Sequence, residues 1–293
     1  MSKMQRLIWV LIVSCSVHAS AQGDISTTDL SSDFFKTGVG LSMGGAYRAM
    51  ATSTQAILYN PAGMRQNIGT LMITGDYTYN NAYDSGHLYG ISVIDTQTSQ
   101  NAAYGLSFQQ SRPSFGGVDA KNNQIIMAIA HQVGAFYTGG SIKGYWVTVD
   151  NPNIDGPKGV DMDLGLMFRP SEMISVGFTG YNLIRGHKIE EYPFQLAGGA
   201  ALTLIPQVTL TADVVKNFNT LATEDINLHF GGRILVNDQI AVRGGYAKDR
   251  IFNNDYYGVG FSILAKQAQI HLAFGQTIDP KTEIFSVSLE YRM

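Results

Sequence analysis

The stretch Glu-Ile-Phe-Ser-Val-Ser-Leu-Glu-Tyr-Arg at residues 283–292 decides the fold class. Its apolar members, from Phe285 to Tyr291, fall on one face of an extended strand, because successive side chains point to opposite faces. Its polar members, from Ser286 to Glu290, fall on the other face. One face for lipid and one for a polar lumen is typical of a strand in a membrane β-barrel.

Similar alternating segments fill the chain from about Gly69 onward, joined by connections that are alternately very short and longer. The expected strands are residues 70–79, 87–96, 102–111, 122–132, 135–149, 160–169, 173–184, 194–204, 208–216, 225–236, 239–248, 256–264, 268–276 and 283–292. The sequence therefore predicts an all-β fold, a closed antiparallel transmembrane barrel of about 14 strands. Such a barrel belongs in a bacterial outer membrane, and an even strand count places both termini in the periplasm.

The composition agrees with one barrel. Of 293 residues only 15% are charged and 32 are glycine, which suits a surface that lies largely in lipid. No run of about 18 apolar residues occurs, so a helical membrane span is excluded. A soluble β-sandwich is the rival, but it does not explain so many strands with an apolar outer face.

Residues 1–21 are expected to be a secretory signal peptide. Lys3 and Arg6 give it a basic start, an apolar stretch follows, and small residues at 19–21 form the cleavage motif. A lipoprotein processing site at Cys15 is the alternative. After cleavage at residue 21, no cysteine remains. The mature chain would have 18 basic and 23 acidic residues, a formal net charge of −5. Nucleic acid is therefore not an expected partner.

Residues 22–67 do not read as strand and are expected to form an N-terminal hatch or periplasmic lead-in, with the barrel at residues 68–293. A short helix is expected over Ser42 to Met50. The sequence Asn60-Pro61-Ala62-Gly63 that follows is a turn signal.

Two glycine-containing elements of the hatch carry a family resemblance: Gly-Val-Gly-Leu-Ser-Met-Gly-Gly-Ala at residues 38–46, and Tyr-Asn-Pro-Ala-Gly-Met at residues 59–64. Together with the strand sequences at 160–165 and 287–291, they resemble the FadL-like superfamily of outer-membrane proteins, and within it the compact PorV-like branch. The residues of the hatch motif are Gly44, Gly45, Ala46, Asn60, Pro61, Ala62 and Gly63.

The resemblance implies a fourteen-stranded barrel whose N-terminal hatch carries the Asn-Pro-Ala element. In the transporting members of that family the hatch blocks the lumen, and hydrophobic ligands leave sideways into the bilayer. This sequence departs from those transporters in its short loops and small hatch, which leave no room for a large external ligand groove.

The sequence gives little support to catalysis. Gly40, Ser42 and Gly44 match the G-x-S-x-G spacing of a serine hydrolase, but the apolar strand that must precede such a motif is missing. The histidines show no metal-binding spacing, and the glycines miss the dinucleotide-binding pattern. We therefore expect no enzyme, no metal site and no cofactor.

Several charged and polar residues have the strand parity that points into the lumen. They are Asp161, Asp163, Asp213, His229, Arg233, Arg243, His271 and Glu290. Because a buried charge needs a partner or water, they should form an ion-pair network or line a wet passage. Glu290, Asp213 or a hatch acid, Asp29 or Asp33, is expected to approach Arg233 or Arg243.

Two functions remain open. The leading interpretation is a transporter or porin-like channel for small hydrophobic molecules, in contact with membrane lipid. The second is a structural or assembly protein, a homo-oligomer that holds lipid or an envelope partner. A lateral gap in the wall near the hatch favours transport, whereas a sealed barrel with a broad apolar contact surface favours assembly.

Overall fold

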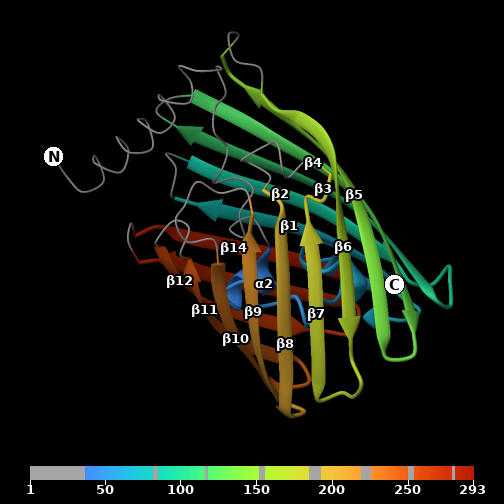
Figure 1. Cartoon of the computed structure of the whole chain (residues 1–293). Helices are drawn as coiled ribbons and strands as arrows, with labels where there is room; N and C mark the ends of the chain where they lie inside the picture. The colour runs from blue at the N-terminus through green and yellow to red at the C-terminus, as the bar shows by residue number, and fades with distance from the viewer. Residues whose placement is uncertain are drawn as a thin grey trace.

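The fold, shown in Figure 1, is described from a computed structural model in which residues 37–81, 85–115, 118–151, 156–184, 193–218, 226–249, 254–278 and 281–293 are described. Fourteen antiparallel strands form one closed barrel, and each strand pairs with its neighbours in the sequence. The first strand, β1 (Leu71–Asn80), closes the ring against the last, β14 (Glu283–Arg292). The predicted fold class is confirmed.

The other strands follow in chain order. They are β2 (Ser85–Asp95), β3 (Ala102–Phe115), β4 (Val118–Val133), β5 (Phe136–Val149), β6 (Lys158–Phe168), β7 (Ile174–Tyr181), β8 (Gln195–Ile205), β9 (Val208–Asn217), β10 (Ile226–Asn237), β11 (Ile240–Asp249), β12 (Asn254–Leu264) and β13 (Ala268–Thr277). Every expected strand is present, and no strand end differs by more than four residues from its expected position.

The alternation of the sequence becomes an alternation of exposure. On β14, Phe285 and Leu289 are 53% and 56% exposed, whereas Ser286 and Ser288 are buried. Large apolar side chains are exposed in this way on every strand, which is the pattern of a wall that faces lipid. The buried polar side chains point into the lumen.

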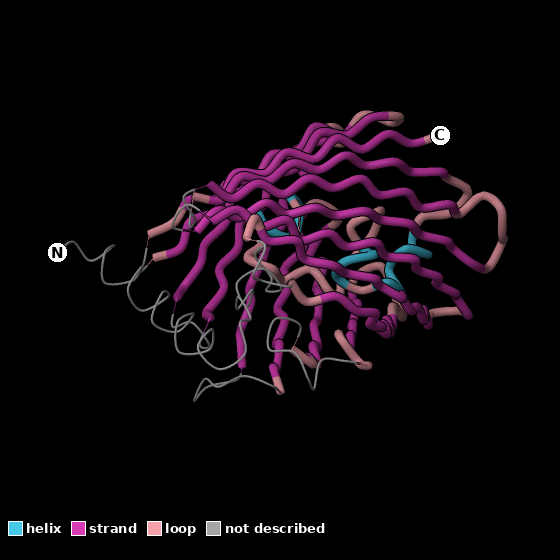
Figure 2. The backbone as a smooth tube through the Cα atoms, turned by 90° about the horizontal axis from the view of Figure 1, so that it is seen from above, coloured by secondary structure: helices cyan, strands magenta, loops and turns pink. Residues whose placement is uncertain are grey.

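Short helical segments lie inside the ring, as Figure 2 shows. They are the α-helices α2 (Gly38–Ser42) and α3 (Ala56–Tyr59) and the 3₁₀-helix η3 (Pro61–Gln66). We refer to residues 37–67 as the hatch, and almost all of its side chains from 37 to 65 are buried. The earlier part of the expected hatch, residues 22–36, and the expected signal peptide lie outside the described residues.

The expected helix over Ser42 to Met50 is wrong. The helix α2 ends at Ser42, and turns follow it. Gly44 and Gly45 have φ angles of +63° and +80°, in the left-handed region that does not continue an α-helix. Within the described part of the chain, no helix is both long and apolar enough to cross a membrane.

One seam in the wall is shorter than the others. The register between β6 and β7 runs only from Leu164↔Gly180 to Phe168↔Val176, five residue pairs, whereas every other pair of neighbouring strands shares eight or more. The first half of β6, Lys158 to Asp163, therefore has no β7 residue beside it in the described sheet. The chain leaves β7 at Asn182, whose φ of 56° turns it away from the strand.

Candidate functional site

The hatch rests against the wall where glycines leave room for it. Gly139 on β5 and Gly165 on β6 are opposite each other in the register. A Cβ atom at Gly139 would lie 2.4 Å from the backbone nitrogen of Ala62, and one at Gly165 would lie 2.1 Å from Oδ1 of Asn60. Any side chain at these two positions would displace the hatch, so the wall and the Asn-Pro-Ala element fit each other closely.

Asn60 joins three parts of the molecule. Its Oδ1 accepts from the backbone N–H of Ala62 at 3.2 Å, which caps η3. Its Nδ2 donates to the carbonyl oxygens of Arg48 in the hatch and Leu166 on β6, each at 3.1 Å. The side chain thus holds two hatch segments together and fixes both to the wall. All four residues of the Asn-Pro-Ala-Gly element are buried: Asn60, Pro61, Ala62 and Gly63.

The Gly44-Gly45-Ala46 element is seated on the opposite side of the lumen. A Cβ atom on Gly44 would lie 2.5 Å from the backbone nitrogen of Tyr246, so the hatch backbone touches β11 directly. The carbonyl oxygen of Gly44 lies 2.8 Å from Nδ1 of His229 on β10. Because a carbonyl only accepts, His229 donates from Nδ1, which fixes its tautomer there.

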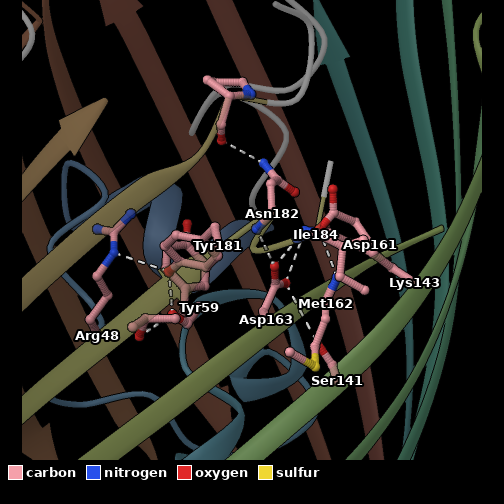
Figure 3. A network of polar contacts seen from close by, with 12 residues as sticks. Arg48, Tyr59, Ser141, Lys143, Asp161, Met162, Asp163, Tyr181, Asn182 and Ile184 are labelled. Carbon is pink, nitrogen blue, oxygen red and sulfur yellow. Dashed lines mark hydrogen bonds and ion pairs between the residues drawn. The ribbon is translucent and has the colours of Figure 1, made fainter. Parts of the chain in front are cut away.

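A buried ion pair links the hatch to β9. NH1 of Arg48 lies 3.2 Å from Oδ2 of Asp213, and both side chains are fully buried. The same carboxylate oxygen accepts the backbone N–H groups of Tyr47 and Arg48, each at 3.0 Å. Nε of Arg48 donates to the hydroxyl of Tyr181 at 3.1 Å, and that hydroxyl donates to the carbonyl oxygen of Tyr59 (Figure 3). Several hydrogen bonds therefore offset the cost of burying the two charges.

A second group of charges stands beside the short seam. Nζ of Lys143 on β5 lies 2.7 and 2.9 Å from the two oxygens of Asp163 on β6 (Figure 3). Asp163 also accepts the backbone N–H of Asn182 at 2.9 Å, and Asp161 accepts that of Ile184 at 2.9 Å. Where the β6–β7 register stops, the backbone N–H of Leu183 still donates to the carbonyl oxygen of Met162 at 2.9 Å, and the two carboxylates hold the residues on either side of it.

The third group contains the two inward arginines of β10 and β11. Arg233 and Arg243 are directly opposite each other in the register. NH2 of Arg233 donates to Oγ1 of Thr209 at 3.2 Å. NH1 of Arg243 donates to the hydroxyl of Ser262, which lies 2.7 Å from Nδ1 of His271. The polar contacts of both arginines are thus with neutral groups.

The expected acidic partners of these arginines are engaged elsewhere. Oε1 of Glu290 lies 2.6 Å from Nε of Arg292 on the same strand, and Asp213 pairs with the hatch. The expectation that Glu290 or Asp213 meets one of the two inward arginines is therefore wrong. Asp29 and Asp33, the other expected partners, lie outside the described residues.

Two charged residues that form ion pairs in the structure were not identified from the sequence. Lys143 stands at the inward parity of its strand, opposite Asp161 in the register, so its parity was an available signal. Arg48 is a single cation between Ala46 and Met50 in an otherwise uncharged run, which is the signature of a charge that needs a buried partner.

The sequence positions that raised the question of catalysis are structural. The hydroxyl of Ser42 donates to the carbonyl oxygen of Val39 at 2.7 Å, within α2. Among the described residues, no group of three or more His, Cys, Asp or Glu side chains is placed to hold a metal ion.

A closed barrel of fourteen strands, apolar outside and filled by an N-terminal segment, is a plugged transmembrane β-barrel. Within that class the chain has the FadL-like fold. The PorV-like branch within it stays a prediction from the sequence.

Solved structures of similar fold carry this assignment. A CymD monoaromatic hydrocarbon channel matches with a TM-score of 0.66 and 14% identity, over 88% of this chain and 97% of that one. A Pseudomonas putida toluene transporter, TodX, matches with a TM-score of 0.64 and 10% identity, over 87% and 96%. A Pseudomonas aeruginosa FadL homologue matches with 0.61 and 13%, over 87% and 98%. No family model matches the sequence, and no curated protein matches it.

Proposed function

We propose that this protein is a non-enzymatic outer-membrane transporter or channel for small hydrophobic molecules. The observation that carries the proposal is the short β6–β7 seam. This seam lies beside the hatch. Asn60 of the hatch donates to the carbonyl oxygen of Leu166, a β6 residue that is paired with β7. A small apolar molecule leaving the lumen here would cross fewer backbone hydrogen bonds than at any other described seam.

The direction of the seam supports the same proposal. The residues of β6 without a β7 neighbour are its first ones, at the end of the barrel opposite the short turn that joins β6 to β7. Short turns mark the periplasmic end of such barrels, so the weak half of the seam belongs to the outer side. The structural neighbours are named as hydrocarbon and toluene transporters, which supports a small hydrophobic cargo.

The rival assembly role lacks an observation of this kind. The exposed apolar side chains are spread over all fourteen strands, as a lipid-facing wall requires. They do not mark one face for a partner or for a second copy of the chain.

The proposal requires the hatch to move, and a reversible crosslink tests this. Oγ1 of Thr54 in the hatch lies 2.6 Å from Oγ1 of Thr74 on β1, so cysteines at both positions are placed to form a disulfide. The chain's own single cysteine, Cys15, lies in the expected signal peptide. We expect the oxidised Thr54→Cys/Thr74→Cys variant to slow uptake of labelled toluene by intact cells, and reduction to restore it.

The matched control places the same crosslink within the wall. The hydroxyls of Ser92 on β2 and Ser107 on β3 are 2.8 Å apart, and neither strand residue belongs to the hatch. The oxidised Ser92→Cys/Ser107→Cys variant should transport like the parent. Equal uptake by the oxidised and reduced hatch variant would contradict a transport route that needs hatch movement.

A further inference from the structure

Two positive charges face each other in the lumen, and the described residues place no acidic partner against them. Arg233 and Arg243 are cross-strand neighbours, a position in which like charges destabilise a sheet. The described residues provide no carboxylate within ion-pair distance of either, and no hydrogen-bond partner for either Nε. Arg243 is only 7% exposed, so bulk water relieves the repulsion only in part.

Both arginines line a cavity of about 200 Å³ between the hatch and the wall. Val39, Met43 and Tyr47 bound it on the hatch side. Burial raises the pKa of the Tyr47 phenol, so this phenol supplies no negative charge at neutral pH.

The charges that line the cavity do not balance. Arg233, Arg243 and Arg292 contribute three guanidinium groups, and Glu290 contributes one carboxylate, which leaves two positive charges uncompensated. Glu290 is already bound by Arg292 and by the hydroxyl of Ser53. The excess positive charge therefore belongs to the Arg233–Arg243 pair.

We propose that the Arg233–Arg243 pair binds a phosphate-type oxyanion in this cavity. The proposal does not depend on the transport function, because it rests only on these charges and on the space before them. Guanidinium groups present planar pairs of N–H donors that match the oxygens of phosphate. A bound oxyanion would satisfy the free Nε donors and remove the repulsion between the two strands.

The oxyanion can come from two sources that share this chemistry. One is free inorganic phosphate, and the other is the phosphate of a lipid headgroup. Leu235, Leu264 and Arg292 line the cavity and lie at the short-turn end of their strands, so the periplasmic side is the shorter route for either source.

Titration of the full mature protein in detergent with inorganic phosphate, at constant ionic strength, tests the site. We expect the parent protein to bind phosphate and Arg243→Gln to bind it at least about tenfold more weakly, since charge-assisted hydrogen bonds are lost. The matched control is Arg112→Gln, an exposed arginine on β3, which should bind like the parent. Heat-modifiable gel mobility verifies that each barrel is folded, and Arg233→Gln replaces Arg243→Gln if the latter does not fold.

A second measurement separates binding from a purely structural role. Without phosphate, Arg243→Gln should melt no lower than the parent, and phosphate should raise the melting temperature of the parent alone. The proposal is overturned if the parent does not bind phosphate, or if Arg243→Gln binds it as well as the parent does.

Reconstitution in phosphatidylcholine vesicles, with and without phosphatidic acid, distinguishes the sources. If phosphatidic acid competes with inorganic phosphate in the parent, the site takes a lipid headgroup. If phosphate binding is the same in both vesicles, the site takes the free oxyanion. Either result supports the site, because each requires phosphate binding that depends on Arg243.

Discussion

The buried charges on the two sides of the lumen differ in their ion-pair and hydrogen-bond partners. From β5 to β9, every buried acid of the network has several donors: Asp213 has Arg48 and two backbone N–H groups, and Asp163 has Lys143 and Asn182. On β10 and β11, two arginines oppose each other with free donors. Charges with an opposite partner hold the hatch and the seam in place, whereas like charges beside a cavity, with no counterion among the described residues, indicate a ligand.

The largest effect should come from breaking the fully buried ion pair between the hatch and β9. Arg48→Met leaves Asp213 buried without its cation, so we expect a loss of about 3–5 kcal/mol in the free energy of unfolding. Urea unfolding in detergent measures it. The double variant Arg48→Met/Asp213→Asn should recover part of the loss, because the uncompensated charge is then gone. A loss below about 1 kcal/mol would mean that the pair behaves like an exposed one.

A smaller effect is expected from the fit between the hatch motif and the wall. Gly165→Ala places a methyl group against Oδ1 of Asn60, which forces the hatch to shift at a cost of about 1–3 kcal/mol. Protease sensitivity of the hatch and urea unfolding should both report the change. Gly75→Ala on β1 is the matched control, because no atom lies within 4 Å of its added Cβ. If both variants unfold alike, the close fit at Gly165 has no energetic weight.

The smallest effect, with the opposite sign, is expected on the arginine side. In phosphate-free buffer Arg233→Gln should raise the free energy of unfolding by about 0.2–1 kcal/mol, because it removes a like-charge cross-strand pair. Arg112→Gln on the outer surface serves as the reference. A clear destabilisation by Arg233→Gln alone would show that this side is satisfied too, and the contrast between the two sides would disappear.

Most of the wall could be predicted from the sequence, because a period of two is a local property. Alternation around residues such as Leu289 sets both the strand and the face that each side chain occupies. The alternation shows which face of a strand a residue occupies. It does not show the position of that residue along the barrel axis, or which residue lies across the lumen from it. The partner of Asp213 is therefore absent from local patterns, since Arg48 belongs to a segment far away in the chain.

The interior of the hatch was harder to predict for a related reason. Its conformation depends on contact with the wall, as at Gly44 against Tyr246. The local sequence around Ser42 favours a helix but does not indicate that contact. The Asn-Pro-Ala element was visible as a motif. Its role in linking Arg48 to β6 depends on the carbonyl oxygen of Leu166, which only the folded barrel brings next to Asn60.

The closure of the ring between the first and last strands sets an order of events during biogenesis. The pairing of Met72 with Arg292 joins the first strand of the barrel to the last, so the ring cannot close until the final strand has been delivered. Contacts of such long sequence separation form late, because much chain entropy is lost before they are made. Ser53 of the hatch contacts Glu290 on that same strand. Closure of the ring and the contact between Ser53 and Glu290 therefore both require β14. A chain truncated before β14 lacks both contacts.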